Sequence, residues 1–114
     1  ALPVTLGSEF ASYTTALTVA RDGIASAKKE LEKVALGGTA VGTGANTPKG
    51  YRNIAIKELS KISKLSLGPQ RDMQYALQSR YAVANMSSAL KNYSVELGKI
   101  ANDIRLMASG PVAG

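Results

Sequence analysis

Apolar residues in the first third of the chain recur in alternating steps of three and four. They are Phe10, Tyr13, Leu17, Ala20, Ile24, Ala27, Leu31 and Val34. This spacing keeps the side chains on one face of an α-helix and is typical of near-parallel helix packing. Ser8 and Glu9 are residues that favour a helix start, and Gly37-Gly38 favours a helix end. The pattern predicts a helix over about residues 8–36.

The last third, residues 71–109, carries two apolar stripes. One has steps of three and four: Val83, Met86, Leu90, Tyr93, Leu97, Ile100, Ile104 and Met107. The other has steps of eleven: Met73, Ala84, Val95 and Leu106. We expect the stripes on roughly opposite sides of a single helix, which would then need neighbours on both sides. A polar set is predicted to lie on a flank between them: Gln78, Asn85, Asn92, Glu96, Lys99 and Asp103.

A loop rich in glycine and threonine, residues 37–50, separates these segments. Thr47-Pro48 is predicted to open a short second helix, since proline is tolerated in a first turn. Its predicted inner face is Tyr51, Ala55, Leu59 and Ile62, and Gly68-Pro69 ends it. The fold class predicted for the chain is all-α, a bundle of long helices forming a single unit over residues 1–114.

Helix length bears on assembly. At 1.5 Å per residue the two long helices would span about 43 and 57 Å, whereas a compact domain of this size is about 35 Å across. We therefore expect an elongated unit whose apolar faces are completed by other helices, and hence a homo-oligomer.

Composition excludes several kinds of chemistry. The 114 residues contain neither cysteine nor histidine, so disulfides, thiolate metal sites and imidazole bases are absent from the sequence. The net charge of +6 would suit an acidic partner. The lysines, however, alternate with glutamates, and the six aromatic residues are scattered, so we expect no nucleic-acid partner. No run is long and apolar enough for a membrane span.

Two constellations have chemical interest. Residues 37–44 hold four glycines and two threonines, and resemble an anion cradle in composition. They lack the spacing of a P-loop or a dinucleotide fingerprint, and a purely structural connection explains them equally well. Glu96, Lys99 and Asp103 lie three and four residues apart, which favours pairing along one helix face over catalysis. No metal site is predicted.

Three motifs together are similar to the aspartase/fumarase family. They are Leu2-Pro3-Val4-Thr5-Leu6-Gly7-Ser8-Glu9-Phe10, Gly37-Gly38-Thr39-Ala40-Val41-Gly42-Thr43-Gly44, and Lys99-Ile100-Ala101-Asn102-Asp103-Ile104-Arg105 with Ser109-Gly110-Pro111. The resemblance covers nearly the whole chain. It implies a fragment of the central helical domain of a cytoplasmic enzyme, whose helices join three other subunits in a tetrameric bundle. The flanking domains would lie outside the fragment.

The resemblance also implies an activity. Asn46-Thr47-Pro48-Lys49-Gly50-Tyr51 and residues 106–111 look most like aspartate ammonia-lyase, which converts aspartate into fumarate and ammonia without a cofactor. Class II fumarate hydratase is the alternative, and a non-enzymatic, basic helical oligomerisation module is a second. The family's threonine-histidine pair and serine loop would lie outside this chain. No catalytic residue is therefore assigned, and the fragment is expected to be inactive alone. Thr39, Thr43 and Asn46 are the predicted substrate-binding residues, for a small dicarboxylate.

Overall fold

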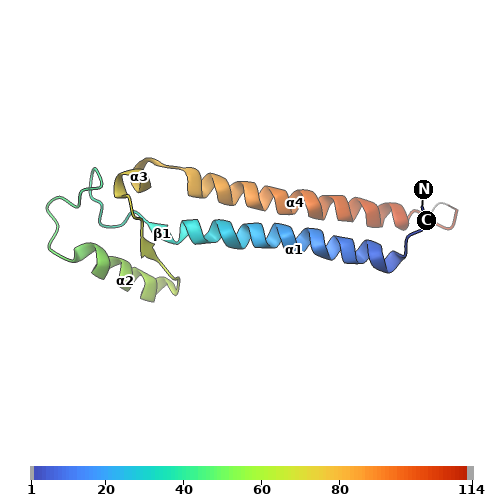
Figure 1. The fold of residues 1–114 in the computed structure, drawn as a ribbon, viewed down its shortest axis with the longest axis horizontal. Coiled ribbons are helices and arrows are strands. Elements are labelled where there is room, and N and C mark those ends of the chain that lie inside the picture. The colour runs from blue at the N-terminus through green and yellow to red at the C-terminus, as the bar shows by residue number, and fades with distance from the viewer. Residues whose placement is uncertain (1, 113–114) are drawn as a thin grey trace. The chain divides into compact units, whose positions relative to one another are not determined.

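The structure, a computed structural model, describes residues 2–112. Its elements are α1 (Leu6–Leu31), β1 (Lys33–Val34), α2 (Tyr51–Ser63), β2 (Gly68–Pro69), α3 (Met73–Gln78) and α4 (Tyr81–Met107) (Figure 1). Helices dominate, and the only strands in the described part are the two-residue pair β1 and β2, so the all-α prediction is confirmed. None of these helices is both long and apolar enough to cross a bilayer.

The chain divides into two compact units. The first combines the residues up to Ser26 with those from Asn85 onward, and the second is Ala27–Ala84. In the first unit, α1 and α4 run antiparallel. A hydrogen bond accordingly joins Tyr13, near the start of α1, to Asp103, near the end of α4. Tyr13 and Ile100 are buried there, and Leu17, Ala20 and Ile24 are half-buried. The predicted inner face of the first helix is confirmed over this stretch.

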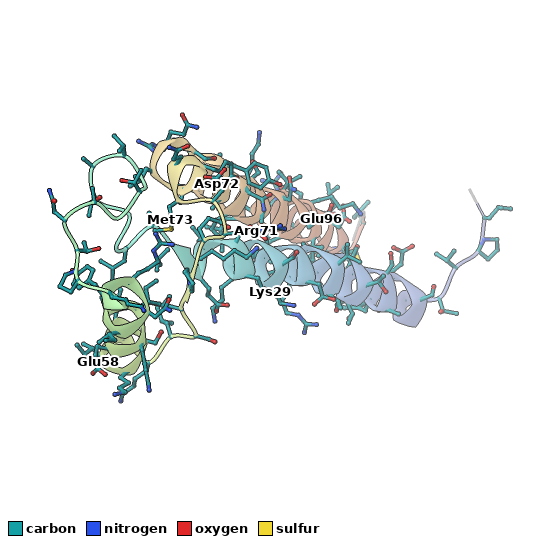
Figure 2. The ribbon with its side chains drawn as sticks, turned by 60° about the vertical axis from the view of Figure 1, so that its left-hand side comes forward. Lys29, Glu58, Arg71, Asp72, Met73 and Glu96 are labelled. Carbon is teal, nitrogen blue, oxygen red and sulfur yellow. The ribbon has the colours of Figure 1, made fainter. Side chains whose placement is uncertain are left out.

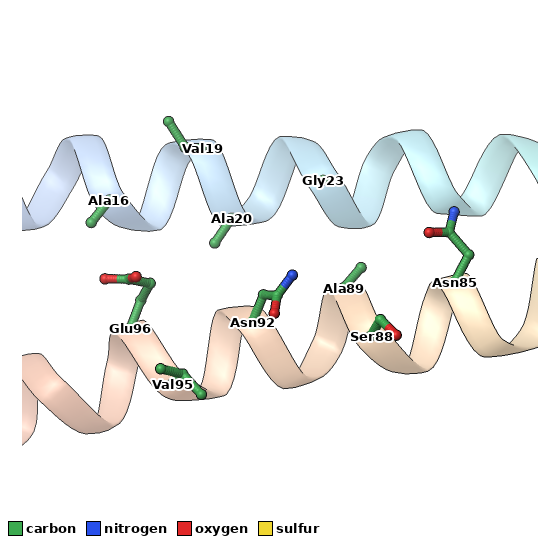
Figure 3. Close-up of a pocket in the computed structure, with 10 residues that line it drawn as sticks. All are labelled: Ala16, Val19, Ala20, Gly23, Asn85, Ser88, Ala89, Asn92, Val95 and Glu96. Carbon is green, nitrogen blue, oxygen red and sulfur yellow. The ribbon is translucent and has the colours of Figure 1, made fainter.

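A groove of about 650 Å³ runs between the two helices, and several of the residues that line it are small. Ala16, Ala20 and Gly23 line it from α1, and Ala89 faces them from α4 (Figure 3). The polar residues Asn85, Asn92 and Glu96 of α4 line the same groove. Glycine and alanine leave room beside the helix backbone, so polar side chains lie along the groove instead of a packed apolar seam.

The apolar stripe predicted for the last helix is only partly an inner face. Ile100 is buried and Tyr93 is half-buried, whereas Leu90, Leu97 and Ile104 are exposed. The predicted polar flank is wrong in part, because Asn85, Glu96 and Asp103 are half-buried on the side that faces α1. Within this unit α4 has one helical neighbour, so only the positions that face α1 are covered.

The first helix ends at Leu31, five residues before the predicted end at 36. Lys33 and Val34 instead pair in parallel with Gly68 and Pro69. The Gly68 N–H donates to the carbonyl of Glu32 at 2.9 Å, and the Gln70 N–H donates to that of Val34 at 3.2 Å. These non-local hydrogen bonds replace helical ones, so Val34 does not continue the helical face.

The predicted helix over 71–109 is also wrong in one respect, because it is two helices, α3 and α4. Asp72 caps α3 by accepting a hydrogen bond from the Tyr75 N–H at 3.0 Å. Ser79 is extended, at φ −73° and ψ 142°, and its hydroxyl oxygen accepts a hydrogen bond from the Tyr81 N–H at 3.1 Å. This places a cap-type residue at the start of α4.

The break between α3 and α4 is stabilised by Arg80. Its Nη1 donates to the carbonyls of Leu77, Gln78 and Ser79 at 3.2–3.3 Å. These carbonyls end a helix and have no helical partner of their own. Met73, assigned from the sequence to a stripe of the long helix, lies on α3 and is buried.

In the second unit, α2 turns a different face inward from the one predicted. Ile56 is buried and Ala55 half-buried, but Tyr51, Leu59 and Ile62 are exposed by 43, 38 and 80 %. Ser60 explains the rotation. Its hydroxyl accepts from the Leu67 N–H and donates to the Leu67 carbonyl, both at 3.2 Å, which fixes this side of α2 against the segment entering β2. The helix itself begins at Tyr51, three residues after Pro48.

Candidate functional site

The glycine-threonine loop is built from left-handed turns. Gly37, Gly42 and Gly44 have φ of 84°, 85° and 73°, and Thr39 and Asn46 also have positive φ. The Gly38 N–H donates to the Ala35 carbonyl at 3.1 Å, and the Gly44 N–H donates to that of Gly38 at 2.9 Å. These two N–H groups, which an anion cradle would have used, are engaged within the chain.

Two of the glycines are required by close packing as well as by φ. A Cβ on Gly37 would lie 2.8 Å from Cβ of Arg52, in the first turn of α2. A Cβ on Gly42 would lie 2.7 Å from the backbone nitrogen of Gln74, at the start of α3. The loop therefore packs its backbone directly on the starts of α2 and α3, which is a structural reason for its glycines.

The three predicted substrate-binding residues have different surroundings. Thr43 lines an open cleft of about 310 Å³, together with Thr47, Lys49 and Arg52 among others. Thr39 is exposed, and its hydroxyl donates to the carbonyl of Gly38 at 2.6 Å. Asn46 is exposed, and neither it nor Thr39 lines this cleft. The geometry thus groups Thr43 with Arg52 and leaves the other two apart.

Arg52 was not singled out from the sequence. It lines the cleft with Thr43 and also a second cleft of about 470 Å³ with Arg71, Gln70 and Gln74. Its helical spacing provides a signal, because residue 52 lies three and four positions before Ala55 and Ile56, the inner face of α2. Figure 2 shows Arg71 and Asp72 just before α3 and Met73 at the start of that helix.

A polar cluster joins the helices of the first unit. Lys99 Nζ lies 2.5 Å from Oδ2 of Asp103, which also accepts a hydrogen bond from the Tyr13 hydroxyl at 3.0 Å. The ammonium lies 5.3 Å from the centre of the Tyr13 ring, and Phe10 packs edge-on against that ring at 5.7 Å. The pairing predicted for Lys99 and Asp103 is confirmed, whereas Glu96 takes part in none of the five ion pairs found in residues 2–112.

The charges in this cluster change one another's pKa. The hydrogen bond from Lys99 lowers the pKa of Asp103, and the same bond raises the pKa of Lys99. Partial burial, followed by the hydrogen bond to Asp103, raises the pKa of Tyr13. All three groups are driven toward the forms they hold at neutral pH, which is the behaviour of a structural ion pair and opposite to that of a general base.

Among residues 2–112, no three carboxylates cluster closely enough to hold a metal ion. On the surface of α2, the hydrogen bond from Lys61 lowers the pKa of Glu58, and the two charges lie 2.6 Å apart. This pair is exposed and belongs to the helix surface.

Relatives of known name align with the whole chain. It is 40 % identical over 114 residues to an aspartate ammonia-lyase of Corynebacterium glutamicum, and 44 % identical to a class II fumarate hydratase of Pasteurella multocida. The aspartate ammonia-lyase of Escherichia coli K12 is 40 % identical. The alignments cover all of this chain but only 22, 25 and 24 % of those three proteins. The chain therefore spans about a quarter of its relatives' length.

Solved structures agree in fold. A fumarate lyase:delta crystallin from Brucella melitensis superposes with a TM-score of 0.90 at 38 % identity, over all of this chain and 25 % of that one. A class II fumarase from Schistosoma mansoni gives 0.86 at 29 % identity, over all of this chain and 27 % of that one. The fold is thus that of the helical part of fumarate lyases. Residues 1–114 match the family described as Lyase, and the chain belongs to this aspartase/fumarase family.

Proposed function

We propose that the full-length protein is an aspartate ammonia-lyase that converts L-aspartate into fumarate and ammonia. The observation favouring this member of the family is Asn46-Thr47-Pro48-Lys49-Gly50-Tyr51, which resembles aspartases more than fumarases. Relatives of both names align at about equal identity, so class II fumarate hydratase is the alternative.

In this reaction, a proton leaves the carbon next to one carboxylate and ammonia leaves the neighbouring carbon. Negative charge accumulates on that carboxylate in an aci-carboxylate intermediate, so catalysis depends on hydrogen-bond donors placed around its oxygens. This chain holds no histidine, and its one Tyr-Asp-Lys cluster has the features of an ion pair. The resemblance to the family implies that the proton-abstracting groups come from other parts of the protein, and we expect this segment alone to be inactive.

Within the segment, Thr39, Thr43 and Asn46 are proposed to assist binding of the dicarboxylate. The location of Thr43 in a cleft with Lys49 and Arg52 supports its assignment most directly. Replacing Thr43 by valine removes a donor at similar volume, and is expected to raise KM for aspartate a few-fold while kcat changes little. Thr43→Ser keeps the hydroxyl and is the matched control. A KM equal to that of the unmodified enzyme in both variants would contradict the assignment.

The protein is further proposed to be a cytoplasmic homotetramer. Apolar residues on α1 and α4 stay exposed in this segment, among them Val19, Leu90, Val95 and Leu106 at 50–67 %. Helices from other subunits would cover such residues, and no cofactor is invoked for the chemistry. A non-enzymatic oligomerisation module would share this surface but not the activity.

The deciding experiment assays the full-length protein by fumarate absorbance, with aspartate and malate in parallel. Fumarate formation from aspartate but not malate supports the proposal. The reverse result assigns the protein to the hydratases, and no turnover of either substrate favours the oligomerisation module.

A further inference from the structure

Arg52 differs from every other basic residue in the described part of the chain. Thirteen of the fourteen lysines and arginines are exposed, and Arg52 alone is half-buried. Gly37 and Gly44 account for its position. The backbone of Gly37 packs on the Cα and Cβ of Arg52, and a Cβ on Gly44 would lie 3.8 Å from Nη2 of its guanidinium. The loop thus packs closely on the stem of the side chain and passes near its tip.

The charge of Arg52 is not neutralised nearby. Across residues 2–112, the five ion pairs within 4.0 Å involve other residues, and the guanidinium of Arg52 makes no hydrogen bond to the protein. A guanidinium carries five N–H donors, and in the described residues no fully buried side-chain nitrogen lacks a partner, so the unpaired donors of Arg52 are open to solvent. An acceptor that enters the cleft of about 470 Å³ can therefore reach these donors directly.

That cleft contains a second free guanidinium. Arg71 lines the cleft of about 470 Å³, and none of the five ion pairs within 4.0 Å in residues 2–112 includes it. The amide side chains of Gln70 and Gln74 add further hydrogen-bonding groups to this cleft. Asp72 also lines the cleft, but its carboxylate is engaged in capping α3 through the Tyr75 N–H. The cleft therefore has a net positive charge, because two arginines and one aspartate line it.

We propose that the cleft between Arg52 and Arg71 binds a small oxyanion, a carboxylate or a phosphate. Guanidinium groups match the paired oxygens of both anions and can bind them through two parallel hydrogen bonds. The cleft volume of about 470 Å³ accommodates such an ion without displacing side chains. The site uses none of the three residues proposed for the substrate, but Arg52 also lines the cleft that holds Thr43, whereas Arg71 lines only the cleft of about 470 Å³.

Arginine-specific modification of the full-length protein by phenylglyoxal, read by peptide mass spectrometry, tests this site residue by residue. Inorganic phosphate and fumarate serve as separate probes, at constant ionic strength set with sodium chloride. At an anion concentration ten times Kd, modification of Arg52 and Arg71 should slow about tenfold. Arg21, exposed and paired with Asp22, is the internal reference and should change less than about twofold.

Variants separate binding from general shielding. Arg71→Gln should raise the anion concentration that half-protects Arg52 about tenfold, because one bidentate partner is lost. Arg21→Gln, the matched control, should leave that concentration unchanged. Protection of Arg71 together with Arg52, by phosphate, by fumarate or by both, supports the site and identifies its preferred anion, whereas protection of Arg52 without Arg71 overturns it. Unaltered modification of Arg52, or slowing equal to that of Arg21, overturns it, whatever the outcome of the fumarate assay.

Discussion

The hydroxyl of Tyr13 donates a hydrogen bond to Asp103 across 3.0 Å, joining two residues that lie ninety positions apart in the chain. Lys99 approaches the same carboxylate oxygen from one turn earlier in α4. The cluster therefore ties the start of α1 to the end of α4 and fixes the register of the two helices.

Tyr13→Phe should loosen the pairing of α1 and α4 near these residues. The ring and its contact with Phe10 remain, but the inter-helix hydrogen bond is lost. In the full-length protein, amide hydrogen exchange in peptides covering residues 6–17 and 97–107 should speed up about three- to tenfold. Tyr75→Phe removes an exposed hydroxyl outside this cluster and should leave these peptides unchanged. Equal exchange rates in the two variants would show that this hydrogen bond does not stabilise the pairing of α1 and α4.

The same pairing should depend on pH in a defined direction. Because the hydrogen bond from Lys99 lowers the pKa of Asp103, the carboxylate stabilises the folded pair at pH values above its ordinary pKa of 3.8. That contribution is lost as pH falls through the lowered folded value. The raised pKa of Lys99 sets the other limit, since its contribution is present below 10.5 and is lost as pH rises through the folded value.

Asp103→Asn provides the measurement for this pH dependence. Hydrogen exchange of residues 97–107, corrected for intrinsic rates, should differ between the unmodified protein and the variant at pH 6–8. The difference should shrink as pH falls below 3.8, because the carboxyl group then binds a proton more readily in the unfolded chain than in the folded pair. A difference that stays constant down to pH 3 would rule out the ion pair as its cause.

Gly42→Ala should destabilise the loop more than a simple propensity change would. Alanine at φ of +85° is strained, and its Cβ would lie 2.7 Å from the Gln74 nitrogen. The expected cost is more than about 1 kcal/mol, visible as a lower thermal midpoint of the full-length protein. Gly98→Ala, within α4 and with open space around it, is the control and should be neutral or stabilising by up to about 1 kcal/mol. The opposite order of stability would refute this account of the loop.

Met73→Ala should cost about 2–5 kcal/mol of unfolding free energy, the range for truncating a buried large side chain. Met73 is 4 % exposed, and its methyl group lies 3.3 Å from where a Cβ on Gly38 would be. Met107→Ala, at 39 % exposure, should cost less than about 1 kcal/mol. Denaturant unfolding of the full-length protein compares the two, and similar losses would place Met73 outside the core.

Leu90→Lys tests the proposed assembly. Leu90 is 50 % exposed on α4, and a charge there would be buried if another subunit covers it. The dissociation constant of the oligomer, measured by sedimentation, should rise at least about tenfold, whereas Leu90→Met should leave it nearly unchanged. Identical oligomers for both variants would show that this face of α4 is not covered.

Local information in the sequence was sufficient for the class of structure. The three-and-four spacing from Phe10 to Ala27 defines a helical face because helix periodicity is a property of the backbone alone. The spacing of Lys99 and Asp103 is an equally local signal. The motifs of the family could also be identified in the amino-acid sequence, and the alignments confirm the family.

Only the tertiary structure decided where helices stop and which faces turn inward. The pairing of Lys33 and Val34 with Gly68 and Pro69 ends α1 early, and no local pattern encodes a contact more than thirty residues away. Ser79 breaks the long helix because its hydroxyl and Arg80 supply hydrogen bonds at that point. The position of Arg52 depends on the loop outside its own helix, because Gly37 packs on its Cα and Cβ and Gly44 lies near its guanidinium. Periodicity determines that a helix forms, whereas burial depends on partners that only the folded chain brings together.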